Sequence, residues 1–344
     1  MKVLELSCSA AAGYAGALLA QLGHQVDRLA CTPALAQTPD ITAAAEQFFH
    51  SDKTELTSAT PRSKTAQHID AAGYDVVIED LGPRGLRGLG WSHRRLRVAS
   101  SSLTLISLSP FGLKGAYQDW QGSDLLAQAV GGVMHSCGYA QEAPLMLPGE
   151  AAYMIAGLHG ATAALSSYYA RDTGVETQGA HIDIAAQDTF MQHWIRHVAE
   201  YAYSGTVMQR GPRDPQGLHY RHTARASDGW VYLLALREPW QDLAAFLGMG
   251  EHLPADAFAP DALQPEWDSM EDAFHTAVLS KSKYEWFADA AELGWTFAPV
   301  EDPFAVAASP QVAARGGMSP VGHSGERGQI PPLPWTSTAR TDPS

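Results

Sequence analysis

The chain has 344 residues, of which 45% are hydrophobic, so it can bury one large core or two moderate ones. Its 37 acidic residues outnumber its 23 basic residues, and the formal net charge is −14. A surface of this sign repels nucleic acid and anionic membranes, and we expect neither as a partner. The three cysteines form no CxxC pair, so the sequence predicts neither a disulfide framework nor a zinc knuckle. This cysteine content fits a reducing cytoplasm.

The first 23 residues superficially resemble a signal peptide, but Glu5 interrupts their apolar run. We interpret them as a strand over Val3 to Leu6 and a helix over about residues 11–22, with a second strand over 25–29. No run of 18 uncharged apolar residues occurs anywhere in the chain, so no transmembrane helix is expected.

Two further β-rich runs, residues 74–80 and 103–112, continue a pattern of strands separated by helical stretches. This pattern predicts a parallel sheet with crossover helices, which binds ligands at the carboxyl ends of its strands. The loops at those ends read SCSAAAG, EDLGPRG and SPFGLKGAY. They contain neither GxGxxG nor GxxxxGK[ST], so the sequence does not support a dinucleotide or a P-loop nucleotide as the ligand.

A basic stretch follows the second of these loops. It reads PRGLRGLGWSHRRLR and contains Arg84, Arg87, Arg94, Arg95 and Arg97. In an acidic protein such a stretch is either a patch for an anionic ligand or a solvated helix face, and both interpretations remain open. If an anion binds here, Arg84 is our candidate contact.

Residues 149–172 predict a long, alanine-rich helix that carries Gly157 and Gly160 in its interior. Interior glycines lower helix propensity, and they often mark the close approach of another backbone or of a ligand. Close packing is the simpler explanation here. Residues 173–192 then predict a turn, a strand and a helix.

A polar stretch with Gly and Pro, residues 204–226, is the best candidate for a domain boundary. Beyond it we predict a strand over 228–236 and helices over 238–249 and 272–293, followed by a mostly irregular tail of about forty residues. The predicted organisation is a large domain over 1–204, a small α+β domain over 205–298, and a C-terminal segment over 299–344. His193 and His197 have a metal-compatible spacing but no third ligand nearby in the sequence, so no metal site is predicted.

Eight motifs occur in the order and spacing of the class III CoA-transferase family, which contains CaiB/BaiF-type proteins, formyl-CoA transferase and α-methylacyl-CoA racemase. Together they span nearly the whole chain, which resembles this family in VLELSCSAAAGYAGALLAQLGHQV, YDVVIEDLGPRGLRGLG, LISLSPFGLKGAY, QGSDLLAQAVGGVM, GEAAYMIAGLHGATAAL, GAHIDIAAQD, SDGWVYL, and SPQVAARGGM followed by PPLPW.

The resemblance implies an α/β fold: a Rossmann-like large domain built from both chain ends, with a smaller domain between them. It also implies a homodimer whose chains interlock like linked rings. The implied substrates are an acyl-CoA thioester and a carboxylic acid acceptor, so coenzyme A would be bound.

Four positions match family residues that line the CoA site: Ala11, Lys53, Leu81 and Gly82. Small residues let backbone N–H groups approach phosphate, and a lysine supplies a point charge for the diphosphate. The sequence departs from the family at Cys31 or a neighbouring residue, where many relatives have an arginine that stacks on adenine.

The largest departure is Tyr153, because the family's transferases have a nucleophilic aspartate at this position. The carbon of a carboxylate becomes electrophilic once it is acylated, whereas a phenol has no such carbon. Tyr153 therefore cannot form a CoA thioester. It can donate a hydrogen bond to a thioester oxygen or an enolate, or act as a general acid.

Three explanations remain open for chemistry without that aspartate. Glu150 lies one helical turn earlier and can act as nucleophile or base, or it can merely complement the helix dipole. Racemase-like proton transfer would use Asp124 and Glu238, which match acidic residues of the racemases, although the racemases' histidine falls on Ser123.

The third explanation is a heteromer. Some members of the family pair an aspartate-bearing subunit with one that lacks it, and the resemblance allows this chain to be a non-catalytic acyl-CoA-binding subunit with an aspartate-bearing paralogue as its partner.

Overall fold

The computed structural model describes residues 1–30, 47–50, 52–56, 71–88, 90–139, 141–210, 219–236, 240–249, 272–320, 329–331 and 333–334. The chain divides into two compact units. The large unit comprises Met1–Met134, Leu145–Val198 and Arg315–Ser344, and the small unit comprises His135–Pro144 and Ala199–Ala314. The sequence predicts divisions after residues 204 and 298, whereas in the structure they lie after residues 198 and 314. The sequence did not predict that residues 135–144 belong to the small unit.

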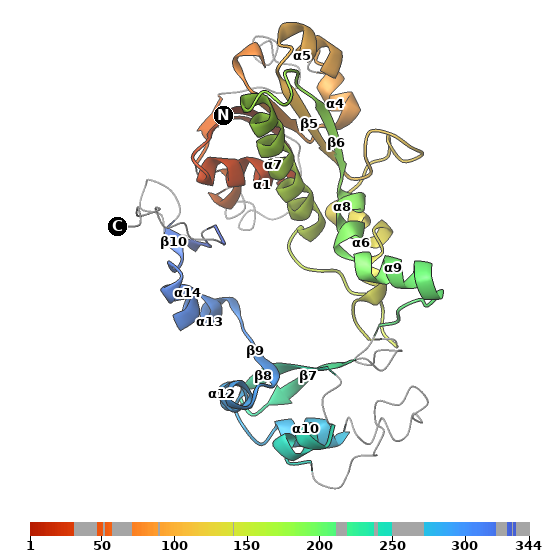
Figure 1. The fold of residues 1–344 in the computed structure, drawn as a ribbon, viewed down its shortest axis with the longest axis vertical. Helices are drawn as coiled ribbons and strands as arrows, with labels where there is room; N and C mark the ends of the chain where they lie inside the picture. The colour runs from red at the N-terminus through yellow and green to blue at the C-terminus, as the bar shows by residue number, and fades with distance from the viewer. Residues whose placement is uncertain are drawn as a thin grey trace. The chain divides into compact units, whose positions relative to one another are not determined.

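A six-stranded parallel sheet forms the centre of the large unit (Figure 1). Its strand order is β3-β2-β1-β4-β5-β6, in which the elements are β1 (Lys2–Ser7), β2 (Gln25–Ala30), β3 (Thr54–Glu55), β4 (Val76–Glu79), β5 (Thr104–Ser109) and β6 (His181–Ala185). Every neighbouring pair is parallel. The parallel α/β sheet predicted from the sequence is therefore confirmed.

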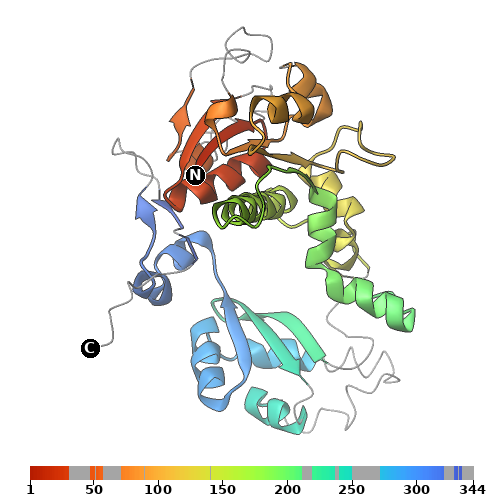
Figure 2. The same ribbon diagram turned by 45° about the horizontal axis from the view of Figure 1, so that its top comes forward.

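Helices cover both faces of this sheet, with α1 and α7 on one face and α4 and α5 on the other (Figure 2). The α-helices described between residues 1 and 204 are α1 (Ala10–Gln21), α4 (Gly82–Gly88), α5 (His93–Ala99), α6 (Asp124–Val130), α7 (Ala151–Asp172), α8 (Ala186–His193) and α9 (Ile195–Ser204), and the division between the two units falls within α9. The core under α4 and α5 joins Leu4 and Leu6 of β1 to Leu86, Trp91 and Leu96.

The crossing of α1 and α7 explains one of the interior glycines. A Cβ atom on Gly157 would lie 2.5 Å from the backbone oxygen of Ala11, which is closer than packed atoms approach. A Cβ on Gly160 would meet only ordinary contacts, at 3.4 Å from Leu108 and 3.5 Å from Ala15. The close backbone approach predicted from these glycines is confirmed at Gly157.

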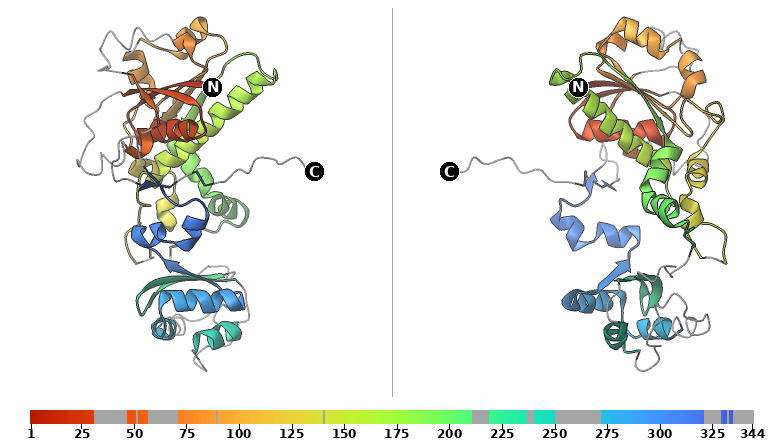
Figure 3. Two further views of the ribbon diagram at one scale, coloured as in Figure 1. Left: turned by 90° about the vertical axis from the view of Figure 1, so that its left-hand side faces the viewer. Right: turned by 45° about the vertical axis from the view of Figure 1, so that its right-hand side comes forward.

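The small unit contains an antiparallel sheet, β7-β8-β9, which consists of β7 (His219–Ala226), β8 (Gly229–Leu236) and β9 (Thr296–Val300). Helices α10 (Trp240–Leu247) and α12 (Lys283–Leu293) accompany it, and residues 272–278 are also helical (Figure 3). Its core includes Leu243, Phe274, Trp286 and Phe297.

Three predicted elements differ in the structure. Residues 219–226, predicted as part of a linker, form β7, where Ala224 and Ala226 are buried and Arg225 between them is exposed. The helix predicted over 272–293 is two helices, because Ser282 and Glu285 form a capping box that starts α12. The tail contains α13 (Pro303–Ala307), α14 (Pro310–Ala314) and the short pair β10 (Ser319–Pro320) and β11 (Gln329–Ile330).

Within the ranges that the structure describes, no helix combines the length and the apolar character needed to cross a membrane.

Candidate functional site

Two acidic residues, Glu79 and Asp80, stand at the carboxyl end of β4. The Asp80 carboxylate accepts hydrogen bonds from the backbone N–H groups of Cys8 (2.7 Å), Ser9 (2.9 Å) and Ala12 (3.4 Å), and from Ser9 Oγ (2.6 Å). Burial raises the pKa of Asp80. This carboxylate therefore occupies the amide groups at the start of α1 that a bound phosphate would otherwise use.

Glu79 has the same relation to α4. Its side chain is buried, and Oε2 accepts from the backbone N–H groups of Leu81 (2.8 Å) and Gly82 (3.2 Å). Burial raises the pKa of the Glu79 carboxyl to about 7. The β4 terminus thus holds the first residues of two helices through two protein carboxylates.

These contacts define how the predicted CoA-lining residues are arranged. The amides of Leu81 and Gly82 are bonded to Glu79, and the amide of Ala11 donates to Ser9 Oγ at 3.2 Å. Contact of Ala11, Leu81 and Gly82 with CoA stays a prediction, and in this arrangement it would use atoms other than their N–H groups.

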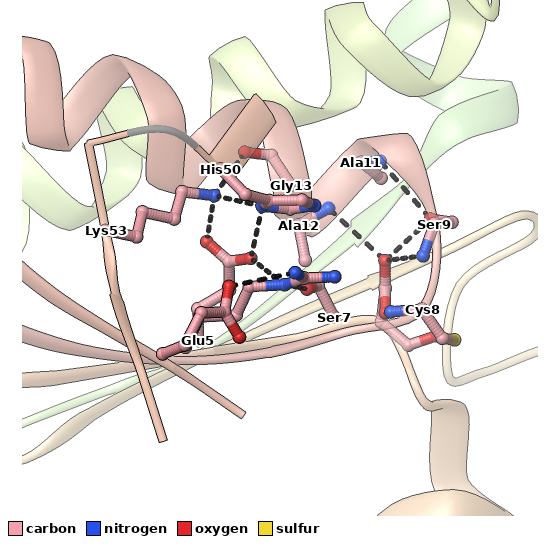
Figure 4. A network of polar contacts seen from close by, with 12 residues as sticks. Glu5, Ser7, Cys8, Ser9, Ala11, Ala12, Gly13, His50 and Lys53 are labelled. Atoms are coloured by element: carbon pink, nitrogen blue, oxygen red, sulfur yellow. Dashed lines mark hydrogen bonds and ion pairs between the residues drawn. The ribbon is translucent and has the colours of Figure 1, made fainter. Parts of the chain in front are cut away.

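Lys53 lies inside the large unit, where its side chain is 1% exposed (Figure 4). Its Nζ atom lies 2.5 Å from Glu5 Oε2, 2.8 Å from the Gly13 carbonyl oxygen and 3.1 Å from His50 Nδ1. Burial lowers the pKa of Lys53 and raises that of Glu5. The charge of Lys53 therefore faces Glu5 and not the surface, and its predicted contact with a diphosphate stays a prediction.

Three arginines of the basic stretch, Arg84, Arg95 and Arg97, differ in their contacts. Arg95 donates to the Gly90 carbonyl at 2.7 Å, and Arg97 donates to Gln178 Oε1 at 2.6 Å. By contrast, the Arg84 side chain is 79% exposed, and its Nε atom lies 4.0 Å from Asp119 Oδ1. Of these three arginines, Arg84 has the guanidinium most available to an anionic ligand.

Asp124 holds the start of α7 from a neighbouring helix. Its Oδ1 accepts from the backbone N–H of Tyr153 at 2.9 Å, and its Oδ2 accepts from Gln128 Nε2 at 2.6 Å. Such an N–H is usually capped by the residue just before its own helix, but Glu150, which has that position, makes no capping bond with its side chain. The carboxylate predicted as catalytic thus caps α7.

Glu150 is the one non-glycine residue with a positive φ among the described residues, with φ 25° and ψ 41°. Its side chain is exposed and accepts no hydrogen bond from any other described residue. Partial desolvation by surrounding protein atoms, together with the charge of Asp124, raises the pKa of its carboxyl. The predicted nucleophile or base is therefore accessible to a reactant.

Tyr153 is half-buried, and burial raises the pKa of its phenol, with further contributions from the charges of Asp80, Asp124, Cys8 and Glu150. The hydroxyl therefore remains protonated at neutral pH and is suited to donate a hydrogen bond, not to act as a base.

Asp124, Glu150 and Tyr153, three of the four residues predicted as catalytic, are thus close together, whereas Glu238 lies outside the described residues. Asp80 was not among the predicted site residues. The loop EDLGPRG could have indicated Asp80, because an acidic residue at the carboxyl end of a parallel strand lies where ligands bind.

In the part of the chain that the structure describes, no three or more His, Cys, Asp or Glu side chains are grouped so that they could hold a metal ion.

The sequence profile of CoA-transferase family III matches residues 1–342. The chain belongs to the class III CoA-transferase family. The curated relatives include the succinate–glutarate CoA-transferase of Agrobacterium fabrum, 23% identical over 92% of this chain and 83% of the relative. The formyl-CoA:oxalate CoA-transferase of Streptomyces avermitilis is 24% identical over 83% of this chain and 75% of that enzyme.

A third family member is named as a subunit: succinyl-CoA:(R)-benzylsuccinate CoA-transferase subunit BbsE of Thauera aromatica, 24% identical over 71% of this chain and 61% of the relative. Among solved structures, a CaiB/BaiF family protein from Brucella suis superposes with a TM-score of 0.83 at 23% identity, over 98% of this chain and 92% of the other. A hypothetical protein from Mycobacterium tuberculosis superposes with a TM-score of 0.76 at 20% identity, with coverage of 98% and 92%. These superpositions confirm the family fold.

Proposed function

We propose that this protein transfers CoA between an acyl-CoA and a carboxylic acid, with Glu150 as the nucleophile in place of the family's aspartate. One observation carries this proposal. Of the three carboxylates whose charges act on Tyr153, only Glu150 accepts no hydrogen bond from a described residue.

The hydrogen bonds of the other two carboxylates argue against them as nucleophiles. Asp80 accepts from four donors and Asp124 from two, so their lone pairs are committed to holding α1 and α7. A carboxylate attacks a thioester only if an oxygen can reach the carbonyl carbon. Glu150 is exposed, and its raised pKa indicates a carboxylate more basic than a solvated one.

The proposed reaction has four acyl-transfer steps. Glu150 attacks the thioester carbonyl, which forms an acyl-glutamyl anhydride and releases CoA thiolate. The thiolate attacks the glutamyl carbonyl, so the donor acid leaves and a Glu150–CoA thioester remains. The acceptor carboxylate attacks the glutamyl carbonyl of this thioester, which forms an anhydride between the acceptor and Glu150 and releases CoA thiolate again. Finally, the thiolate attacks the acceptor's carbonyl carbon, which gives the new acyl-CoA and restores the Glu150 carboxylate.

Each step passes through a tetrahedral intermediate with a negatively charged oxygen. A neutral phenol donates a hydrogen bond to such an oxygen without carrying a charge itself, and Tyr153 is held neutral by burial and by neighbouring carboxylates. We assign Tyr153 the role of oxyanion donor.

For the CoA moiety, we propose that Arg84 contacts a phosphate, because its guanidinium is exposed. Ala11, Leu81 and Gly82 would line the pantetheine path along the carboxyl ends of β1 and β4. Lys53 would contribute through Glu5 and Gly13, by fixing the position of α1. We also retain an interlocked homodimer and a cytoplasmic location as parts of the proposal.

The proposal is tested by incubating the purified protein with a panel of acyl-CoAs and analysing its peptides by mass spectrometry. The expected product is CoA attached to the peptide that contains Glu150, removable by hydroxylamine and absent from Glu150→Gln. Transfer to an added carboxylic acid that persists undiminished in Glu150→Gln would overturn the assignment of the nucleophile.

A second candidate function is supported by the similarity to the BbsE subunit and by tyrosine at the family's nucleophile position. In it, the chain is a non-catalytic acyl-CoA-binding subunit of a heteromer. This predicts CoA binding without any Glu150–CoA product, and transferase activity only after an aspartate-bearing paralogue is added.

Proton transfer at the α carbon of the acyl group, with Asp124 and Glu238 as the acidic residues, is tested by running the same incubation in D2O. If this chemistry occurs, deuterium appears in the acyl group without CoA transfer.

A further inference from the structure

We propose that Gln128 is a positioning residue that holds the Glu150 carboxylate free and correctly placed for reaction, an inference that rests on the proposed role of Glu150. Gln128 lies on α6, one turn after Asp124, and its side chain is fully buried. Neither the family resemblance nor the motifs of the sequence assigned it a role.

The buried amide of Gln128 has partners for both of its polar atoms. Its Nε2 donates to Asp124 Oδ2 (2.6 Å) and to the Leu147 carbonyl (3.1 Å), and its Oε1 accepts from the Leu147 N–H (2.9 Å). The pair of bonds to Leu147 holds a backbone segment in the way that a neighbouring strand would. Because a buried amide group left without a hydrogen-bond partner is destabilising, these three bonds fix the orientation of the side chain.

Gln128 therefore fixes the chain on both sides of Glu150. It binds Leu147 directly, three residues before Glu150, and through Asp124 it fixes the N–H of Tyr153, three residues after. The residue between these two points has φ 25° and ψ 41°, a conformation that side chains other than glycine rarely adopt. Such a conformation is strained for a residue other than glycine and persists only where the surroundings impose it.

Because of the same arrangement, the Glu150 side chain does not have to cap α7. The residue before a helix ordinarily turns its side chain inward to bond the N–H of the third helical residue, which here is Tyr153. Asp124 already bonds that N–H, and Gln128 orients Asp124 for it. The Glu150 carboxylate is thus left for a reactant.

The test compares Gln128→Met, which keeps the length of the side chain but removes its hydrogen bonds, with Gln192→Met as a matched control. Gln192 is exposed on α8, and its side chain makes no hydrogen bond with a described residue. Gln128→Met should slow formation of the Glu150–CoA thioester about tenfold at saturating acyl-CoA, with KM nearly unchanged, because misplacing a reacting group lowers kcat more than binding. Gln192→Met should behave like the parent protein, and equal rates in all three proteins would overturn the proposal.

Exchanging the hydrogen-bond donor and acceptor between positions 124 and 128 tests whether their contact can be restored. Gln128→Glu places two carboxylates together, and Asp124→Asn places two amide groups together, so each single variant should be impaired. The double variant restores one donor facing one acceptor between positions 124 and 128, but not the bond from position 128 to the Leu147 carbonyl, so it should recover part of the lost rate. A double variant slower than both single variants would contradict the proposed contact.

One readout does not depend on catalysis. Carbodiimide-mediated coupling of an amine to carboxyl groups, followed by peptide mass spectrometry over a range of pH, reports how readily Glu150 reacts relative to exposed Glu176. The reactivity of Glu150 should change in Gln128→Met relative to the parent, whereas that of Glu176 should stay the same in both proteins. If the parent forms no Glu150–CoA while the reactivity of Glu150 still changes in Gln128→Met, the proposed nucleophile fails and the positioning role stands. An unchanged Glu150 profile in Gln128→Met overturns the positioning role.

Discussion

The carboxylate of Asp124 accepts the backbone N–H of Tyr153 at 2.9 Å, so the first turn of α7 is capped by a residue that lies 29 positions earlier in the chain. This single contact gives both residues a structural role. Asp124 holds the start of α7 in place, and Tyr153 is fixed through its backbone, so its phenol is not needed for this contact.

The role of the phenol predicts the behaviour of Tyr153→Phe. Removing one oxyanion donor lowers kcat by about 10²–10³-fold where that donor acts in the transition state. Because Tyr153 is not the proposed nucleophile, the variant should still form the Glu150–CoA thioester, only slowly. Single-turnover formation of the thioester, followed by quenched-flow mass spectrometry, measures this rate. Complete absence of the thioester in Tyr153→Phe, with the fold intact, would assign Tyr153 a more direct role.

Five strands of the large unit, β1, β2, β4, β5 and β6, were predicted, mainly because their residues form short runs rich in apolar side chains between turn signals, whereas β3 was not predicted. Residues 74–80 illustrate this, since Val76, Val77 and Ile78 are all buried in β4 as expected for a parallel strand covered on both faces. Strand β7 was missed because its residues are mostly polar, and only its pairing with β8 shows that Ala224 and Ala226 face the core.

The candidate site was only partly predictable, for a different reason. The family motif predicted Tyr153 as a site residue, but the hydrogen-bond partners of its neighbours come from residues far away in the chain. No local pattern indicates that Lys53 is neutralised by Glu5, 48 residues earlier, or that Gln128 binds Leu147. Such contacts depend on tertiary packing, which a single sequence does not reveal through spacing alone.

The buried ion pair between Lys53 and Glu5 predicts a large loss of stability when one partner is removed. Lys53→Met leaves a buried carboxylate without its nearest cation, and such a change costs about 3–5 kcal/mol. Asp119→Asn, which removes one charge of the exposed contact with Arg84, should cost at most about 1 kcal/mol. Urea denaturation measures both. A loss of equal size in the two variants would show that Glu5 finds another partner.

The crossing of α1 and α7 predicts opposite effects for two alanine substitutions in one helix. Gly157→Ala would place a methyl group 2.5 Å from the Ala11 carbonyl oxygen, and overpacking of this kind costs about 1–3 kcal/mol. Gly160→Ala meets only ordinary contacts and should gain up to about 1 kcal/mol from the higher helix propensity of alanine. Thermal and urea unfolding measure the stability of both variants against the parent. A Gly157→Ala protein as stable as the parent would contradict the close crossing of α1 and α7.

Glu79 predicts a pH dependence of stability whose sign follows from its raised pKa. The folded-state pKa is about 7 and the ordinary value is 4.5, so the folded protein binds a proton more tightly than the unfolded chain between these values. Glu79 therefore lowers the free energy of unfolding progressively as pH rises from about 4.5 to 7, by a total of about 3 kcal/mol, and the loss stays constant above that range.

Glu79→Gln isolates this effect because glutamine keeps an oxygen for the N–H groups of Leu81 and Gly82 and cannot ionise. Parent and variant should have similar free energies of unfolding below about pH 4.5, and the variant should be more stable by a few kcal/mol at pH 8. Asp80 is present in both proteins, but its charge contributes to the raised pKa of Glu79, so the difference in stability reports this pair of carboxylates and not Glu79 alone. Urea titrations at several pH values measure the gap. A gap that does not widen between pH 5 and pH 7 would show that Glu79 is already ionised in the folded protein at low pH.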